Sequence, residues 1–260
     1  MPPLPSAILQ FINNNPLVAN KIGQSPSDVY SFSKNGELFY LKMTALIYSN
    51  TTYSTLREAQ ILNWLAGKLN VPEVVCISKD HENEYMITKA VDATAIANLK
   101  FDGKELISIY QNTLQQLQSI AIQDCPFLSN IDYRLQESQF FIDHDLLDDI
   151  DRDDIDVHVW GKFQSQVQLI EYLNQNKFPE DFVFSHGDIT DSNIFLNNKD
   201  EIFFLDVGRA GIADQFVDIT FIERCLREDC SNEAALLFLQ SIPQDHAFKR
   251  DYFLKLDELN

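Results

Sequence analysis

The pattern of apolar and polar positions divides the chain into a strand-rich first third and a helix-rich remainder. Strand-like runs at residues 29–33 and 37–43 flank an Asn-Gly dipeptide at 35–36, which favours a type I′ hairpin turn. Two more runs, near residues 74–77 and 85–88, are joined by a polar turn. Together the four runs predict an antiparallel sheet.

Apolar residues take helical spacing elsewhere in the chain. A helix is expected from about residue 55 to residue 66, with Ala59, Leu62, Leu65 and Ala66 towards one face and a glycine ending it. Further helical periodicity occurs near residues 106–117, near 167–173 and after Asp218. This change of character near residues 90–98 predicts an α+β fold with two lobes. An antiparallel β N-lobe would span residues 1–92, and a mostly helical C-lobe residues 93–260.

A cluster of polar residues lies among short apolar runs in the second half of the chain: Asp188, Asn193 and Asp206. An Asp with an Asn five positions later is typical of a kinase catalytic loop, in which the Asp accepts the hydroxyl proton and the Asn holds a metal. Asp206 ends the next apolar run, where a second carboxylate would hold Mg²⁺ against nucleotide phosphates. Alone, each could be a turn residue; in this order they indicate a phosphotransferase. His186 is expected to be a buried, hydrogen-bonded scaffold residue.

The N-terminal third contains the residues expected to bind the nucleotide. Lys42 lies in a strand and Glu58 in the first turn of a helix, an arrangement by which kinases place an ammonium group on the α- and β-phosphates. Two alternatives are an edge-strand lysine and a capping box between Thr55 and Glu58. The loop at residues 23–28 has a single glycine, so phosphate contacts would fall to Ser25, Ser27 and backbone amides. The cleft between the lobes is the expected nucleotide pocket.

Composition limits the function classes. The 260 residues carry 39 acidic and 20 basic side chains, a net charge of −19, which argues against nucleic-acid binding and favours a cationic partner. No run of about 18 apolar residues and no signal-peptide pattern is present, so we expect a soluble, cytoplasmic enzyme without membrane association. The four cysteines lack the spacing of zinc or disulfide frameworks.

Acidic residues are concentrated in a segment at about residues 143–158, which contains Asp143, Asp145, Asp148, Asp149, Asp151, Asp153, Asp154 and Asp156. One interpretation is a short amphipathic helix with a solvated acidic face. Beside a phosphotransferase site, the same segment would hold a polyamine substrate. Each carboxylate–ammonium contact contributes about 1 to 4 kcal/mol, so micromolar binding needs several such contacts.

Four strings of sequence, at residues 21–30, 185–195, 205–214 and 224–229, resemble the aminoglycoside 3′-phosphotransferases, and the likeness runs nearly end to end. Within that family the chain is most similar to the type VI, amikacin-modifying enzymes. The resemblance implies a two-lobed protein-kinase-like fold, ATP with Mg²⁺ as cofactors, and transfer of the γ-phosphate to the 3′-hydroxyl of an aminoglycoside. Such a reaction confers antibiotic resistance.

The resemblance also implies roles for individual residues. Tyr40 would stack on adenine, Ser25 would touch phosphate, Lys42 and Glu58 would form the ion pair, Asp188 would be the catalytic base, and Asn193 and Asp206 would hold metal. The drug-binding residues would be Asp153, Asp156, Arg209, Glu228, Asp257, Glu258 and the terminal carboxylate of Asn260. Asn260 stands where some relatives end in an aromatic residue. Gly187, Val207 and the lack of an Ala-Pro-Glu element separate the chain from protein kinases, so control by phosphorylation is not expected.

Two other functions are compatible with the sequence. The catalytic residues do not name the acceptor, so a kinase of another small amine or sugar, such as choline or fructosamine, is the alternative enzyme. A catalytically dead acidic module that binds a basic protein is the non-enzymatic alternative. Phosphate transfer measured across a panel of acceptors separates these hypotheses.

Overall fold

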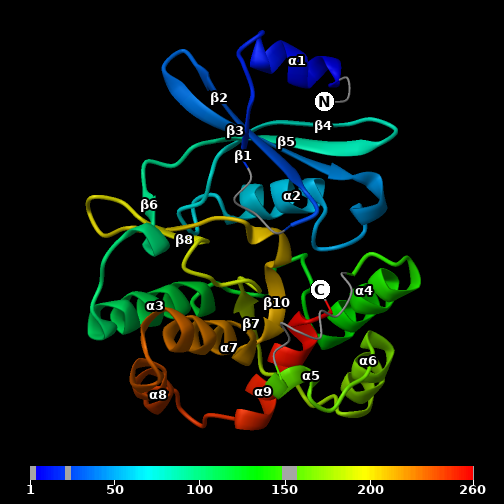
Figure 1. Ribbon diagram of the computed structural model, residues 1–260. Coiled ribbons are helices and arrows are strands. Elements are labelled where there is room, and N and C mark those ends of the chain that lie inside the picture. The colour runs from blue at the N-terminus through cyan, green and yellow to red at the C-terminus, as the bar shows by residue number, and fades with distance from the viewer. Residues whose placement is uncertain (1–3, 21–24, 148–156, 260) are drawn as a thin grey trace. The chain divides into compact units, whose positions relative to one another are not determined.

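The computed structural model describes residues 4–20, 25–147 and 157–259. Contacts within the chain divide it into two compact units. Unit 1 comprises Met1–Lys100 and Asp191–Arg209, and unit 2 comprises Phe101–Thr190 and Ala210–Asn260. The sequence suggests a single boundary between residues 92 and 93. The contacts instead assign a second stretch of chain, residues 191–209, to the N-terminal unit. Figure 1 follows the chain through both units.

Unit 1 contains a five-stranded antiparallel sheet with the order β1-β2-β3-β5-β4. Its strands are β1 (Val18–Asn20), β2 (Asp28–Lys34), β3 (Glu37–Ala45), β4 (Val74–Lys79) and β5 (Asn83–Lys89). At the β2–β3 turn, Asn35 has φ 53° and Gly36 has φ 81°. Both values are positive, as a type I′ turn requires, so the predicted hairpin and the four predicted strands are confirmed. Strand β1 is an addition that the sequence did not predict.

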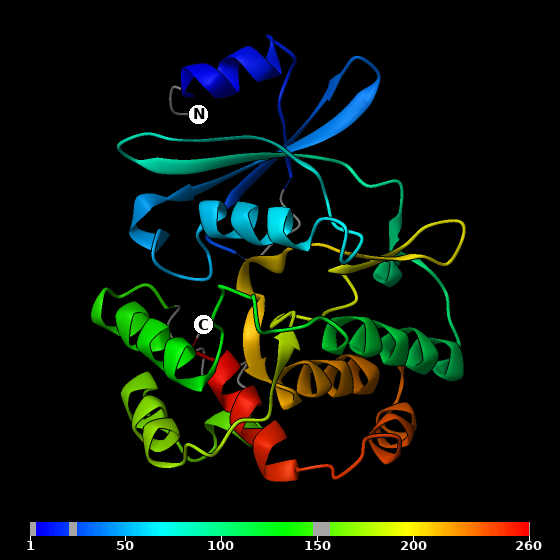
Figure 2. The ribbon, with the colours of Figure 1, turned by 180° about the vertical axis from the view of Figure 1, so that it is seen from behind.

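Strand β3 presents different residues to the two faces of this sheet, because side chains alternate along a strand. Phe39, Leu41 and Met43 are buried in an apolar cluster that also contains Ile8 and Ile12 of helix α1 (Ser6–Ile12). Tyr40 and Lys42, which are both partly exposed, belong to the other set. Figures 1 and 2 show α1 and helix α2 (Thr55–Leu65) on opposite faces of the sheet. The face of the sheet that packs on α1 is thus part of the apolar core, and the face towards α2 carries the polar side chain of Lys42.

Helix α2 begins after Ser54, whose Oγ accepts a hydrogen bond from the backbone N–H of Arg57 at 3.1 Å. The alternative capping box between Thr55 and Glu58 is therefore wrong: Ser54 is the N-cap, and Glu58 lies one position too far into the helix for that motif. The predicted helix and its buried face are confirmed. Ala66, however, lies just past the helix end and is exposed.

The rest of unit 1 includes a small sheet with the order β6-β8-β9, made of β6 (Thr94–Ala95), β8 (Ile194–Leu196) and β9 (Ile202–Phe204). Three short helical turns accompany it, η1 (Leu46–Tyr48), η2 (Ile96–Asn98) and η3 (Val207–Arg209). The backbone carbonyl of Asn70 accepts from Phe204 N at 2.9 Å, and the Asn70 side chain donates to the Ile202 carbonyl at 3.0 Å. Asn70 therefore joins β9 to the segment that follows α2.

Unit 2 is mostly helical. Its helices are α3 (Gly103–Gln118), α4 (Ile131–Asp143), α5 (Val157–Trp160), α6 (Gln166–Gln175), α7 (Phe216–Cys225), η4 (Leu226–Cys230), α8 (Asn232–Gln240) and α9 (Ala247–Asp257), and strands β7 (Phe182–Ser185) and β10 (Gly211–Asp214) pair antiparallel. Helices α3, α6 and α7 correspond to the three predicted periodic segments. Among the described residues, none of the helices has the length and apolar character needed to span a membrane.

Candidate active site

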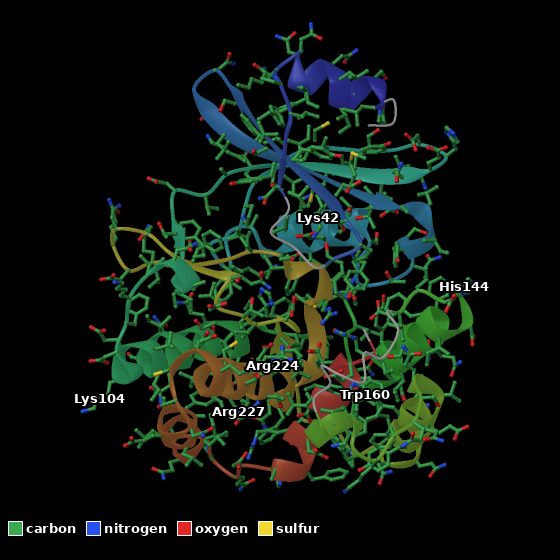
Figure 3. All side chains as sticks on the ribbon, viewed as in Figure 1. Lys42, Lys104, His144, Trp160, Arg224 and Arg227 are labelled. Carbon is green, nitrogen blue, oxygen red and sulfur yellow. The ribbon has the colours of Figure 1, made fainter. Side chains whose placement is uncertain are left out.

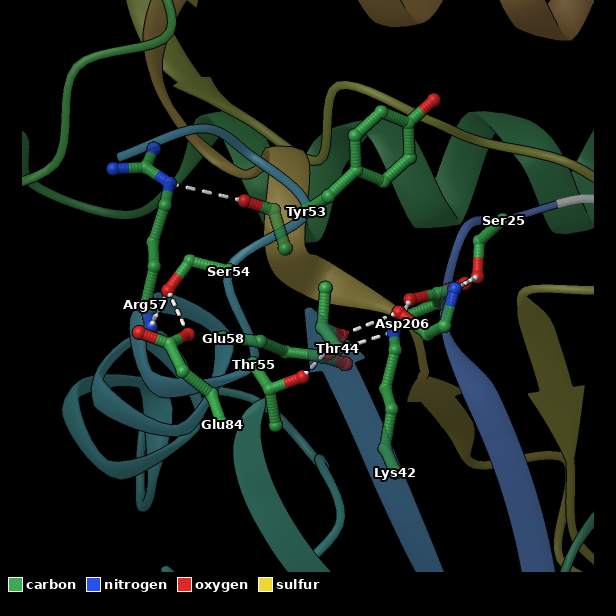
Figure 4. Close-up of polar contacts among 12 residues, drawn as sticks. Ser25, Lys42, Thr44, Tyr53, Ser54, Thr55, Arg57, Glu58, Glu84 and Asp206 are labelled. Carbon is green, nitrogen blue, oxygen red and sulfur yellow. Dashed lines mark hydrogen bonds and ion pairs between the residues drawn. The ribbon is translucent and has the colours of Figure 1, made fainter. Parts of the chain in front are cut away.

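Lys42 is the centre of a three-residue ion cluster in unit 1. Its Nζ donates to Glu58 Oε2 at 2.8 Å and to Asp206 Oδ1 at 2.7 Å (Figure 4). The Lys42 and Glu58 side chains are only 16% and 7% exposed. Burial lowers the pKa of Lys42, but the carboxylates of Asp206 and Glu58 outweigh burial and raise that pKa above its ordinary value. Strand β3 lies between β2 and β5, so the alternative of an edge-strand lysine is wrong.

The backbone of Asp206 adopts an uncommon conformation that neighbouring contacts hold in place. Asp206 has φ 54°, in the left-handed region that costs free energy for a residue with a Cβ. Two residues later, an added Cβ on Gly208 would lie 2.6 Å from the carbonyl oxygen of Thr52. Arg57 Nε donates to the Gly208 carbonyl at 3.1 Å (Figure 4). The segment that carries Asp206 is therefore packed directly on the start of α2, where only glycine fits.

Asn193 lies near Asp206 because β8 and β9 form a hairpin. Ile194 pairs with Phe204, and the carbonyl of Asn193 accepts from Leu205 N at 3.0 Å. Residues 193 and 206 therefore come to the same end of this hairpin. A carboxylate and an amide oxygen are ligands that suit Mg²⁺, which is held by few protein ligands together with phosphates. The donor set at this hairpin end thus fits the metal that the sequence implies.

Asp188 follows a buried, hydrogen-bonded turn in unit 2. The carboxylate of Asp218 accepts hydrogen bonds from the backbone N–H groups of His186 and Gly187, both at 3.0 Å. His186 and Asp218 are buried, and Gly187 has φ 78°. Burial raises the pKa of Asp218, and the charge of His186 and these N–H groups oppose that rise. Sequence reasoning missed Asp218 as a positioning residue, although a single Asp within the apolar run 216–222 was a signal.

The expected phosphate loop is partly described. Ser25 Oγ accepts from the backbone N–H of Ser27 at 3.3 Å. The Ser27 hydroxyl itself lies 2.6 Å from Thr44 Oγ1, a partner that the sequence did not indicate. Tyr40, the expected adenine-stacking residue, is partly buried and shares its face of β3 with Lys42. Loop, Tyr40 and Lys42 all belong to unit 1.

Arg209 belongs to unit 1 and contacts the loop that precedes α2. Its Nη2 donates to Tyr53 Oη at 2.9 Å, and its guanidinium carbon lies 5.5 Å from the centre of the Tyr53 ring. The resemblance implies that Arg209 would contact the drug. The structure adds that a tyrosine holds its guanidinium.

The expected drug-binding carboxylates that the structure describes lie in unit 2. Asp257 accepts from Arg224 Nη1 at 2.8 Å, and Glu258 Oε2 accepts from Trp160 Nε1 at 2.6 Å. Figure 3 labels Arg224 and Trp160. The Glu228 side chain is 60% exposed. Asp153, Asp156 and Asn260 lie outside the described residues. Glu228, Asp257 and Glu258 thus come from the end of α9 and from η4.

Comparisons with known proteins identify the family of the chain. The phosphotransferase enzyme family matches residues 27–245 of the chain. An aminoglycoside 3′-phosphotransferase from Acinetobacter baumannii is 56% identical over 257 residues, covering 99% of each chain. The chain belongs to the aminoglycoside 3′-phosphotransferase family. Both the recognised family and the enzyme class expected from the sequence are thereby confirmed.

Solved structures of aminoglycoside phosphotransferases share the fold. An aminoglycoside 3′-phosphotransferase of type VIII is similar with a TM-score of 0.80, 23% sequence identity and 98% coverage of both chains. An aminoglycoside phosphotransferase from Streptomyces rimosus, in complex with ADP and streptomycin, has a TM-score of 0.73 and 16% identity, covering 98% of this chain and 96% of that one. These likenesses confirm the protein-kinase-like α+β fold class.

Proposed function

We propose that the protein transfers the γ-phosphate of ATP to the 3′-hydroxyl of aminoglycosides of the kanamycin and amikacin type. The observation that carries this proposal is the contact of Lys42 with both Glu58 and Asp206, in a chain of the aminoglycoside 3′-phosphotransferase family. The same comparisons favour this acceptor over choline or fructosamine. The proposal also holds that the enzyme works in the cytoplasm, that it uses ATP rather than another nucleotide, and that it is of type VI.

Each residue of unit 1 has a chemical task in this reaction. The Lys42 ammonium binds nucleotide phosphates, and Glu58, which is almost fully buried, holds that ammonium in place. Tyr40 stacks on the adenine, and Ser25 contacts a phosphate. Asp206 and Asn193 hold Mg²⁺, which when bound neutralises charge on the phosphates.

Unit 2 supplies the base and the binding of the acceptor. Asp188 orients the 3′-hydroxyl and accepts its proton, while Asp218 fixes the backbone of the preceding residues. Asp257, Glu258 and Glu228 bind ammonium groups of the drug, together with Asp153, Asp156 and the terminal carboxylate of Asn260. Arg209 of unit 1 bonds hydroxyls at the edge of the drug. A net charge of −19 favours the approach of a polycation.

The test is ATP consumption by the purified protein with Mg²⁺, with and without kanamycin or amikacin, followed by mass analysis of the drug. We expect consumption that depends on the drug and a gain of one phosphate on it. Choline and a fructosamine serve as parallel acceptors, and Asp188→Asn serves as the matched inactive variant. Turnover with choline and none with kanamycin would overturn the proposal.

A further inference from the structure

Three hydroxyl groups in unit 1 form a continuous chain from the expected phosphate loop to helix α2. Ser27 Oγ lies 2.6 Å from Thr44 Oγ1, and Thr44 Oγ1 lies 2.6 Å from Thr55 Oγ1. Ser27 immediately precedes β2, Thr44 lies on β3, and Thr55 is the first residue of α2. We call Ser27, Thr44 and Thr55 the hydroxyl chain.

The two threonines of the hydroxyl chain are buried, with exposed fractions of 1% for Thr44 and 0% for Thr55. A buried hydroxyl costs free energy unless it is hydrogen-bonded, whereas valine has the same shape without that cost. The contacts within the chain satisfy both hydroxyls. They also join the loop, the strand and the helix through directional contacts.

Counting protons shows what the hydroxyl chain can offer to a ligand. Each hydroxyl has one proton to donate and lone pairs to accept with, and in both contacts either atom could be the donor. If Thr55 donates to Thr44, and Thr44 donates to Ser27, the proton of Ser27 is left for an outside acceptor. An anion next to Ser27 favours this direction, and hydrogen bonds in such a series strengthen one another.

The position of the hydroxyl chain connects it to the ion cluster. Thr44 lies two residues beyond Lys42 on the same strand, so both side chains leave the same face of β3. Thr55 precedes Glu58 by about one helical turn on α2. The elements that carry Ser25, Lys42 and Glu58 are therefore linked through the three hydroxyls.

We propose that the hydroxyl chain aims the Ser27 proton at a phosphate group of the nucleotide, with Thr44 and Thr55 as positioning residues. This inference rests on the proposed function, because it requires that unit 1 binds a nucleotide. It gives Ser27 a donor role that depends on two residues with no exposure to a ligand.

The test is titration of the full-length protein with ADP and Mg²⁺ by calorimetry. Thr55→Val keeps the shape of the side chain and removes its hydroxyl, and Ser27→Ala removes the other end of the hydroxyl chain. Loss of a hydrogen bond to a charged phosphate corresponds to a Kd for ADP raised about 10- to 100-fold in Ser27→Ala. Thr55→Val weakens that bond without removing the Ser27 proton, so it should raise the Kd less. Ser27→Ala removes the donor itself and should have the larger effect, and the double variant should bind about as well as Ser27→Ala alone, because Thr55 acts only through Ser27. Thr55→Ser, which keeps a hydroxyl, should restore most of the affinity.

Two controls separate positioning from general stability. Thr113→Val removes another buried hydroxyl, which donates to the Ile109 carbonyl in unit 2; it should lower stability and leave ADP binding unchanged. Adenosine, which has no phosphate, should bind the Thr55→Val variant as it binds the unmodified protein.

The outcomes distinguish this inference from the proposed function. Unchanged ADP affinity in both Thr55→Val and Ser27→Ala would overturn the hydroxyl chain while leaving the proposed function intact. No ADP binding by the unmodified protein would remove the proposed function and this inference with it. If Thr55→Val does not fold, Ser27→Ala decides the matter, because Ser27 lies at the partly exposed end of the hydroxyl chain.

Discussion

Replacing Lys42 by methionine should destabilise the protein by about 3 kcal/mol near pH 8. Methionine keeps much of the apolar stem and removes the ammonium that lies between two carboxylates. Removing one partner of a buried ion pair costs about 3 to 5 kcal/mol. We expect the low end, because the Asp206 side chain is 44% exposed and water can solvate it. Glu58, at 7% exposure, is the buried carboxylate that loses the Lys42 ammonium.

The loss should be smaller near pH 5 than near pH 8. In the unmodified protein the pKa of Lys42 is raised, so its stabilising effect is fully present below the unfolded value of about 10.4 and does not change across this range. In the variant, burial without the Lys42 ammonium favours the protonated form of the Glu58 carboxyl. Protonation of Glu58 therefore stabilises the folded variant at low pH, and this stabilisation is lost as the pH rises.

Urea denaturation at the two pH values measures this effect, with the linear dependence on denaturant giving each free energy of unfolding. The double variant Lys42→Met with Glu58→Gln should recover most of the loss near pH 8, because a neutral amide then replaces the buried carboxylate. Lys89→Met is the matched control: Lys89 pairs with Glu37, and both side chains are largely exposed, so its removal should change little. An equal loss at both pH values, without rescue by Glu58→Gln, would refute the reasoning.

Three further predictions test other parts of the structure. Asp188→Ala should lower kcat by at least about 100-fold and leave ADP affinity unchanged, as measured by steady-state kinetics and calorimetry; near-normal turnover would contradict its role as the base. Gly208→Ala should cost about 1 to 3 kcal/mol of stability, because the added Cβ would clash with a backbone carbonyl. Gly103→Ala is the control and should cost less, because its added Cβ would meet only a cysteine side chain at 3.3 Å. Equal shifts in the melting temperature of the two variants would contradict this packing. Burial raises the pKa of Glu180 from 4.5 to about 7, so the stability it contributes is present below pH 4.5 and lost as pH rises through 7. Glu180→Gln should flatten the change in urea midpoint between about pH 5 and pH 8, and an unaltered profile would exclude this source.

Local sequence signals were sufficient for four of the five strands of the sheet and for the Lys42–Glu58 pair. The hairpin is encoded by two residues, Asn35 and Gly36, whose positive φ values few other residues tolerate. Lys42 and Glu58 each lie in an element with a clear period, and the catalytic motif downstream indicates their pairing. Helix α1 was missed because it is short, and only Ile8 and Ile12 mark its buried face.

Contacts between distant parts of the sequence were not predictable in the same way. Lys42 and Asp206 are 164 positions apart, and no local pattern encodes their contact. Threonine is a β-branched residue that is common in strands, so Thr44 on β3 needs no further explanation in the sequence. Its hydroxyl contacts with Ser27 and Thr55 therefore could not be predicted from the sequence. The clash that requires glycine at position 208 depends on the carbonyl of Thr52, which appears only in three dimensions.

The return of residues 191–209 to unit 1 affects how the protein can be made and how it can recombine. During synthesis, the first hundred residues leave the ribosome without β8, β9 and Asp206, so unit 1 can close only after residue 209 has been added. The intervening ninety residues of unit 2 are complete as a stretch of chain before unit 1 is. A gene crossover near residue 100 between two relatives would join Lys42 and Glu58 of one parent to Asp206 and Gly208 of the other. Recombinants of that kind would succeed only where both parents agree on the packing around Gly208, so the N-terminal hundred residues are not inherited as an independent nucleotide module.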